Sequence, residues 1–185
     1  GINSIYYLFI LSFSILGPFL IQDFWGYSAV FYGHMALLMG VAWVVGTYIA
    51  KWLSAYFSAA QILLPVSILS TIILLSNLWL AFNTHNNIYT LIIPLFITVM
   101  MSGVAFPKSM GCAMSVFDKS LGGTAGSVVG VITFLLSAIG SMAVSNIHPT
   151  SQIPWAAAIL ILMAVNWVFI VIFYAFRKRY NYPIN

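Results

Sequence analysis

The stretch PWAAAILILMAVNWVFIVIFYAF, residues 154–176, decides the fold class of this chain. It contains no charged side chain, and the basic cluster Arg177-Lys178-Arg179 follows it directly. About 20 helical residues cross a hydrocarbon core roughly 30 Å thick, so this stretch is long enough to span a bilayer. A basic cluster immediately after such a stretch is typical of the cytosolic end of a transmembrane helix.

Five further apolar stretches precede this one, and none of the six contains Asp, Glu, Lys or Arg. Turn-forming pairs such as Asn86-Asn87 and His148-Pro149 separate them. A transmembrane β-barrel would instead alternate apolar and polar residues over about 10 positions, and no segment does so. The sequence therefore predicts an all-α membrane protein, a single six-helix bundle over residues 1–185. The predicted helices are 2–21, 28–50, 62–82, 88–106, 123–145 and 154–176.

The composition excludes a soluble globular protein and several kinds of site. Of 185 residues, 63% are hydrophobic and 4% are charged, whereas soluble domains are about 25% charged. The formal net charge is +4, but the basic residues do not interleave with aromatic residues as in nucleic-acid grooves, so no nucleic-acid partner is expected. Cys112 is the only cysteine, which excludes a disulfide within the chain and multi-cysteine metal centres. We expect no metal and no cofactor.

The positions of Lys and Arg predict the topology. All six follow the second, fourth or sixth predicted helix, at Lys51, Lys108, Lys119 and 177–179. The other connections carry Asp23, His85 and His148 instead. The positive-inside rule then places both ends of the chain in the cytosol.

No enzyme motif is present. The chain lacks His-Glu-x-x-His, Gly-x-Ser-x-Gly and a phosphate-binding Gly-rich loop. An intramembrane protease would need a pair of Asp residues or a Ser with a neighbouring His, but the predicted helices contain no Asp and only one His, His34. We therefore predict that the chain is not an enzyme.

Two groups of residues are candidates for binding. His34 is the only histidine inside a predicted helix, and these helices contain no Asp, Glu, Lys or Arg. Its side chain could relay a proton or contact a substrate. It could equally be a neutral histidine hydrogen-bonded by a neighbouring helix. Tyr6, Phe9 and Phe13 recur on one helix face. Such a face can line a cavity for apolar compounds or pack against lipid or another helix.

Glycine and proline residues suggest how the helices pack. Gly122, Gly126 and Gly130 recur every four residues, and Gly33 belongs to a similar small-residue ridge on 28–50. Smooth faces of this kind let another helix approach closely, for static packing or for sliding during transport. We expect Gly126→Leu to force helices apart.

Proline residues predict irregular helix geometry at two places. Pro18 lies late in the first predicted helix and Pro94 lies within the fourth, where kinks are expected, while Pro107 follows the end of the fourth. Kinked helices can line a cavity, although they also occur in membrane proteins without such a role.

Three segments carry a family resemblance. They are the first helix with its Leu16-Gly17-Pro18-Phe19 ending, the Gly26-Tyr27 start of the second, and the segment from Pro107 through Ala113-Met114 and Phe117 to Gly123-Thr124-Ala125-Gly126-Ser127 and Gly130. Together with the six predicted helices, they resemble the C-terminal half of a major facilitator superfamily transporter. Within that superfamily they are similar to the bicyclomycin/chloramphenicol resistance (Bcr/CflA) drug-efflux branch. The resemblance covers nearly the whole chain.

One segment departs from the superfamily pattern. The cytosolic motif Gly-x-x-x-Asp-Arg-x-Gly is reduced here to Gly46 and the cation Lys51, with Ala50 at the acidic position. This departure puts the charge-relay role of the loop in doubt, although degenerate second copies of the motif are common in the superfamily.

The resemblance implies a transport function. It implies alternating access of two six-helix halves around a central site, with a small amphipathic substrate exported in exchange for protons. The partners would be the bilayer, the substrate and an N-terminal half of the same polypeptide, and the start at Gly1 suggests a piece of such a longer protein. Cavity-lining helices of the family correspond to 2–21, 28–50, 88–106 and 123–145. The candidate cavity residues on them are Tyr6, Phe9, Phe13, His34, Met101 and Thr133.

Two alternatives remain open. The direction of transport is not encoded in helix composition, so the protein could take up a small solute instead of exporting one. The chain could also be a stand-alone six-helix membrane scaffold or a half-transporter that forms homodimers.

Overall fold

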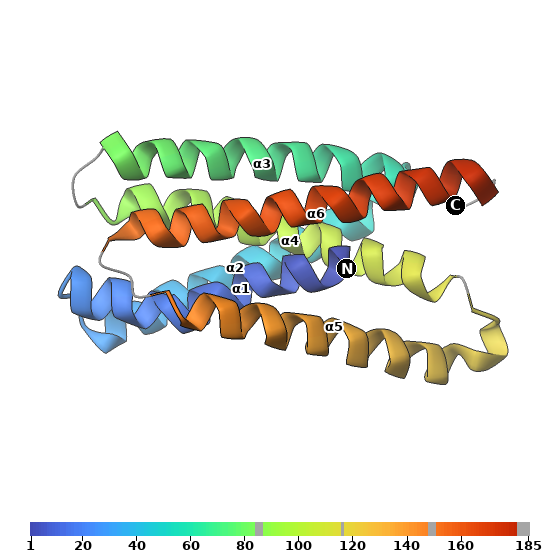
Figure 1. The fold of residues 1–185 in the computed structure, drawn as a ribbon, viewed down its shortest axis with the longest axis horizontal. Helices are drawn as coiled ribbons and strands as arrows, with labels where there is room; N and C mark the ends of the chain where they lie inside the picture. Colours follow the sequence, from blue (N-terminus) through green and yellow to red (C-terminus); the bar gives the residue numbers. More distant parts are fainter. Residues whose placement is uncertain (84–86, 116, 148–150, 181–185) are drawn as a thin grey trace.

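Each apolar stretch of the sequence forms a long helix. The computed structural model describes residues 1–83, 87–115, 117–147 and 151–180, without the side chains of 119 and 177–180. The predicted outer-loop residues His85 and His148 lie outside the described residues. In order, the elements are α1 (Ile2–Pro18), the π-helical η1 (Phe19–Phe24), α2 (Ala29–Leu53), α3 (Ala59–Asn83), α4 (Tyr89–Met114), the 3-10 turn η2 (Lys119–Leu121), α5 (Gly122–Ser145) and α6 (Gln152–Tyr180) (Figure 1).

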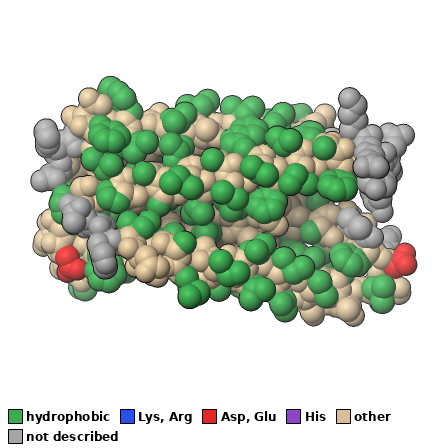
Figure 2. All heavy atoms as spheres, viewed as in Figure 1, with side chains coloured by type: hydrophobic (Ala, Val, Ile, Leu, Met, Phe, Trp, Pro, Cys, Tyr) green, Lys and Arg blue, Asp and Glu red, His purple; other side chains and the backbone are tan. Residues whose placement is uncertain are grey.

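The bundle has the surface of an integral membrane protein. Six helical segments are long and apolar enough to cross a bilayer, the first of them formed by α1 and η1 together. In Figure 2 hydrophobic side chains cover the long side of the bundle, and acidic side chains appear only at its two ends. No strand occurs in the described parts of the chain. The predicted all-α membrane class with six transmembrane helices is confirmed.

Two helices extend further than the sequence pattern indicated. After Pro18 the first helix continues as the wider η1, where the Trp25 N–H donates to the Leu20 carbonyl at 3.1 Å. Proline cannot donate a hydrogen bond to the preceding turn, which favours such a local change of helix type. Gly26 then ends the segment with a φ of 73°. The fourth helix continues through Pro107 to Met114 rather than ending at residue 106, because a helix that is supported by its neighbours tolerates the one hydrogen bond that proline removes.

The helix pairs follow an internal symmetry. α1 and α4 pack against each other at the centre; α2 and α3 pack on α4, while α5 and α6 pack on α1, and α3 also packs on α6. Exchanging α1, α2 and α3 with α4, α5 and α6 leaves this pattern unchanged. Counterpart helices run in opposite directions, as α1 and α4 do in Figure 1. The bundle therefore has the pairing pattern of an inverted repeat of two three-helix units.

The closest backbone approach joins α2 to α4. A Cβ atom added to Gly46 would overlap the Met100 carbonyl oxygen and lie 3.0 Å from the Gly103 Cα. A Cβ added to Gly103 would in turn overlap the Trp43 carbonyl oxygen. Glycine at both positions therefore allows these two helices to touch along their backbones.

The glycine stripe of α5 is not packed in this way, contrary to the expectation from its spacing. A Cβ added to Gly122 or Gly130 would meet nothing within 4 Å, and one added to Gly126 would lie 3.7 Å from the Met114 Cε. At these three glycines the end of the Met114 side chain is the one described contact that an added Cβ would make, so no helix backbone approaches this face closely.

Candidate functional site

Four aromatic side chains from four helices form a cluster on the bundle. Tyr7 of α1 lies with its ring centroid 6.1 Å from Phe106 of α4 and 5.6 Å from Phe134 of α5. Trp43 of α2 lies 5.2 Å from Phe106. Tyr7, Trp43 and Phe106 are half-buried and Phe134 is 61% exposed. Three rings of this aromatic cluster are therefore partly packed between helices, and the fourth, Phe134, is accessible.

The helix packing explains why these rings meet. The Gly46 and Gly103 contact brings the α2 and α4 backbones together, and Trp43 and Phe106 each lie three residues from one of these glycines. Residues three apart on a helix share a face, so both rings lie beside the contact. Tyr7 comes from the central helix α1, which packs against both α4 and α5.

A buried polar cluster lies on the same helices as these rings, and each of its members is within four residues of one of them. The Asn3 Nδ2 donates to the Thr133 Oγ1 at 3.1 Å, and the Ser109 Oγ donates to the Asn3 Oδ1 at 3.1 Å. All three side chains are buried. Asn3 lies four residues before Tyr7 on α1, and Ser109 three residues after Phe106 on α4, so the two clusters share the same helices.

The combined site is polar but uncharged. Neither cluster contains an ionisable carboxylate, amine or imidazole, since its members are the seven residues named above. Aromatic faces attract apolar groups and cations, whereas the amide and hydroxyl groups of the polar cluster are buried and hydrogen-bonded to one another. The accessible part of the rings can therefore contact a flat apolar group or a cation, and neither cluster supplies a carboxylate, amine or imidazole side chain.

The structure places four of the predicted cavity residues in the core. Tyr6 and Phe9 are fully buried, and the Tyr6 hydroxyl is hydrogen-bonded to the Ser67 Oγ of α3 at 2.8 Å. Phe13 is 3% exposed, and its ring lies against Tyr32. Met101 of α4 is also buried. These side chains fill the space between helices rather than lining an accessible surface.

The remaining predicted cavity residues lie in different surroundings. Thr133 belongs to the polar cluster, next to Phe134 of the aromatic cluster. His34 of α2 is exposed. Along that helix it lies more than two turns before Trp43, the residue that α2 contributes to the aromatic cluster.

The residues predicted to shape the helices are also separated. Pro18 immediately precedes η1, and Pro94 is buried within α4, where its carbonyl accepts a hydrogen bond from the Thr98 Oγ1 at 2.8 Å. Gly33 is exposed, and an added Cβ would meet nothing within 4 Å. Gly46 lies inside α2 rather than in a loop, and Lys51 lies in the last turn of the same helix.

Sequence reasoning missed most of the site. Tyr7 and Phe106 were not identified, nor were Asn3 and Ser109. The signal that could have found them is the polar residue Asn3 placed four positions before Tyr7, because these positions share one helix face.

Comparison of the chain with family models, curated proteins and solved structures found no significant match. The resemblance to the major facilitator superfamily consequently rests on the sequence motifs described above.

Proposed function

We propose that this chain forms one half of a membrane transporter that exports small amphipathic compounds by alternating access in exchange for protons. The observation that carries the proposal is the aromatic cluster, because its members come from α1, α2, α4 and α5. These are the helices that the family resemblance implies as cavity walls. The inverted-repeat pairing of the helices supports the proposal, since many transporters are built from such repeats.

The chemistry of the site favours an amphipathic substrate. The rings of the aromatic cluster can stack on a flat apolar group, while the buried polar cluster links α1 to α4 and α5 beside them. A permanent cation is also compatible, since aromatic faces attract cations and no Lys or Arg belongs to either cluster.

Proton coupling requires a group that this site does not supply. The only acidic residues of the chain are Asp23 and Asp118, which lie in η1 and in the connection after α4. We propose that the proton-binding carboxylate belongs to an N-terminal six-helix half of the same polypeptide.

The orientation follows from the basic residues. Lys51 and residues 177–179 lie in the last turns of α2 and α6, Lys108 lies in the last two turns of α4, and Lys119 comes after that helix. The proposed cytosolic side is this basic end of the bundle, with both ends of the chain on the same side, in a bacterial inner membrane.

Substitution in the aromatic cluster tests the proposal. In cells that express the protein at its native length, Tyr7→Ala or Phe106→Ala should lower the efflux of a fluorescent amphipathic cation roughly four- to tenfold, because a half-buried ring contributes about half of the roughly 1.5–3 kcal/mol of a fully buried one. Trp79→Ala is the matched control, since Trp79 of α3 is 64% exposed and lies on a helix outside the site. Equal efflux by Tyr7→Ala, Trp79→Ala and the wild type would reject the site. Accumulation in place of efflux would point to uptake, and no transport by the wild type would favour a scaffold.

The open glycine stripe of α5 provides a test for a partner half. In the isolated chain, Gly126→Leu should leave thermal stability nearly unchanged, because the nearest atom to an added Cβ is the flexible end of Met114 at 3.7 Å. In the native-length protein the same substitution should lower transport strongly if another helix packs on this face. The two measurements are thermal unfolding of the purified chain and efflux from cells. Full transport in the variant would contradict packing of a partner on this stripe.

A further inference from the structure

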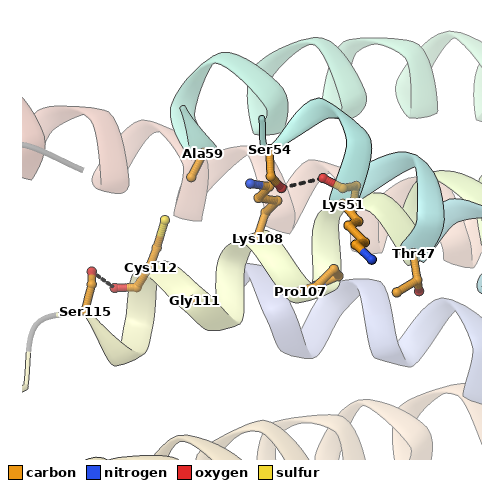
Figure 3. Close-up of a pocket in the computed structure, with 10 residues that line it drawn as sticks. Thr47, Lys51, Ser54, Ala59, Pro107, Lys108, Gly111, Cys112 and Ser115 are labelled. Atoms are coloured by element: carbon orange, nitrogen blue, oxygen red, sulfur yellow. Dashed lines mark hydrogen bonds between the residues drawn. The ribbon is translucent and has the colours of Figure 1, made fainter. Parts of the chain in front are cut away.

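A pocket lies at the basic end of the bundle, between α2, α3 and α4. It has a volume of about 370 Å³. Figure 3 shows Lys51 extending from α2 and Lys108 from α4, with Lys108 pointing toward the end of α2 that carries Ser54. The buried side chains of Ala50, Ala59 and Cys112 form its floor.

The pocket is positively charged and lacks a counter-ion of its own. Among its described lining residues two are lysines and none is acidic. Lys108 is half-buried and Lys51 is exposed. The two carboxylates of the sequence, Asp23 and Asp118, do not line the pocket.

The α3 helix adds to this positive potential. Ala59 is the first residue of α3 and lines the pocket, so the amino end of the helix dipole lies against it. The first-turn amide groups of a helix have no partner within that helix and favour an anion. The amino end of α3 therefore borders the same pocket as the two lysines.

The helix dipole accounts for the position of only one of the two lysines. Lys51 lies in the last turn of α2, where a cation interacts favourably with the carboxyl end of the helix. Lys108 is six residues before the end of α4, outside its last turn. An anion in the pocket would compensate the charge of Lys108, which the helix dipole does not.

We propose that this pocket binds a phosphate group, carried by an anionic lipid headgroup or by a soluble phosphate compound. A phosphate presents several oxygens to donors that converge from different directions, and basic pockets between transmembrane helices bind lipid phosphates. The Thr47 Oγ1 donates to the Trp43 carbonyl at 3.0 Å and the Ser115 Oγ to the Cys112 carbonyl at 2.9 Å, so the lysines are the side chains left to contact the phosphate. This site is separate from the aromatic cluster and does not depend on the proposed transport function.

Thermal unfolding of the purified chain in a neutral detergent tests the proposal with two probes. Phosphatidylglycerol or inorganic phosphate, at a hundredfold excess over its Kd, should raise the Tm by about 5 °C, while the zwitterionic phosphatidylcholine should not. A rise with phosphatidylglycerol alone assigns the site to a lipid headgroup, and a rise with inorganic phosphate also admits a soluble ligand. No rise with either probe overturns the proposal.

Charge variants localise the effect. The double variant Lys51→Gln with Lys108→Gln should bind about 25-fold more weakly, on the basis of about fivefold for each lysine, whereas Lys51→Arg with Lys108→Arg should retain binding. Adding Asp118→Lys to the double Gln variant restores the formal net charge of +4 at the same end of the bundle but outside the pocket. Recovery of binding in this triple variant, or unchanged binding in the double Gln variant, overturns the assignment to the pocket.

Discussion

Gly46→Ala is expected to lower the Tm of the purified chain by about 10 °C, corresponding to a loss of about 3 kcal/mol. The new methyl group would overlap the carbonyl oxygen of Met100, which belongs to the backbone of α4 and cannot rotate away. Either α2 and α4 must separate or one of them must bend, and both responses disrupt the central packing of the bundle. Thermal unfolding followed by circular dichroism measures the effect.

Gly40→Ala is the matched control for this prediction. Gly40 lies on the same helix as Gly46, but an added Cβ would meet nothing within 4 Å. Because alanine favours a helix over glycine by roughly 0.8–1 kcal/mol, this variant should be as stable as the wild type or slightly more so. The close approach of α2 and α4 would be refuted if Gly46→Ala and Gly40→Ala had the same Tm.

Phe9→Ala should destabilise the chain by about 3–5 kcal/mol, the usual cost of removing a fully buried aromatic ring. The Phe9 ring is completely inaccessible and makes an edge contact with Tyr6, with ring centroids 5.7 Å apart. Its loss leaves a cavity next to the central helix that the surrounding helices cannot fill without moving. Chemical or thermal unfolding of the purified variant measures the loss.

Phe19→Ala provides the comparison, since Phe19 lies in η1 and is 52% exposed. Its removal should leave stability nearly unchanged. The pair also separates two roles for Phe9. If Phe9→Ala kept full stability and altered only the transported compounds, Phe9 would line a substrate cavity, as the sequence suggested, rather than pack in the core.

The sequence predicted the helices well because the bilayer imposes a simple requirement. A segment that crosses it must be long and apolar, and every described helix from α1 to α6 meets this condition. The ends were less predictable, as the continuation of α4 through Pro107 illustrates. Tertiary contacts, rather than local preference, decide whether a proline ends such a helix.

The accessible face of α1 could not be predicted, because hydrophobicity does not separate the inside of a membrane bundle from its outside. Lipid is as apolar as the core, so residue type does not tell which side chains face inward. Tyr6 and Tyr7 are both tyrosines on α1, but Tyr6 is buried and Tyr7 is half-buried. The tight contact between helices was missed for a related reason. It depends on Gly46 and Gly103 meeting across two helices, and neither belongs to a regular glycine repeat.

The pairing of helices has a consequence for the order in which the chain assembles during synthesis. Among the residues that the structure describes, α1 makes only a small contact with α2, and α3 has its main partners in α4 and α6. A nascent chain that has inserted residues 2–83 therefore holds three hydrogen-bonded but largely unassociated helices in the lipid. Insertion of α4 supplies the common partner, so tertiary structure should appear abruptly when residues 89–114 leave the insertion machinery. A chain truncated before residue 89 should remain open to degradation by membrane proteases.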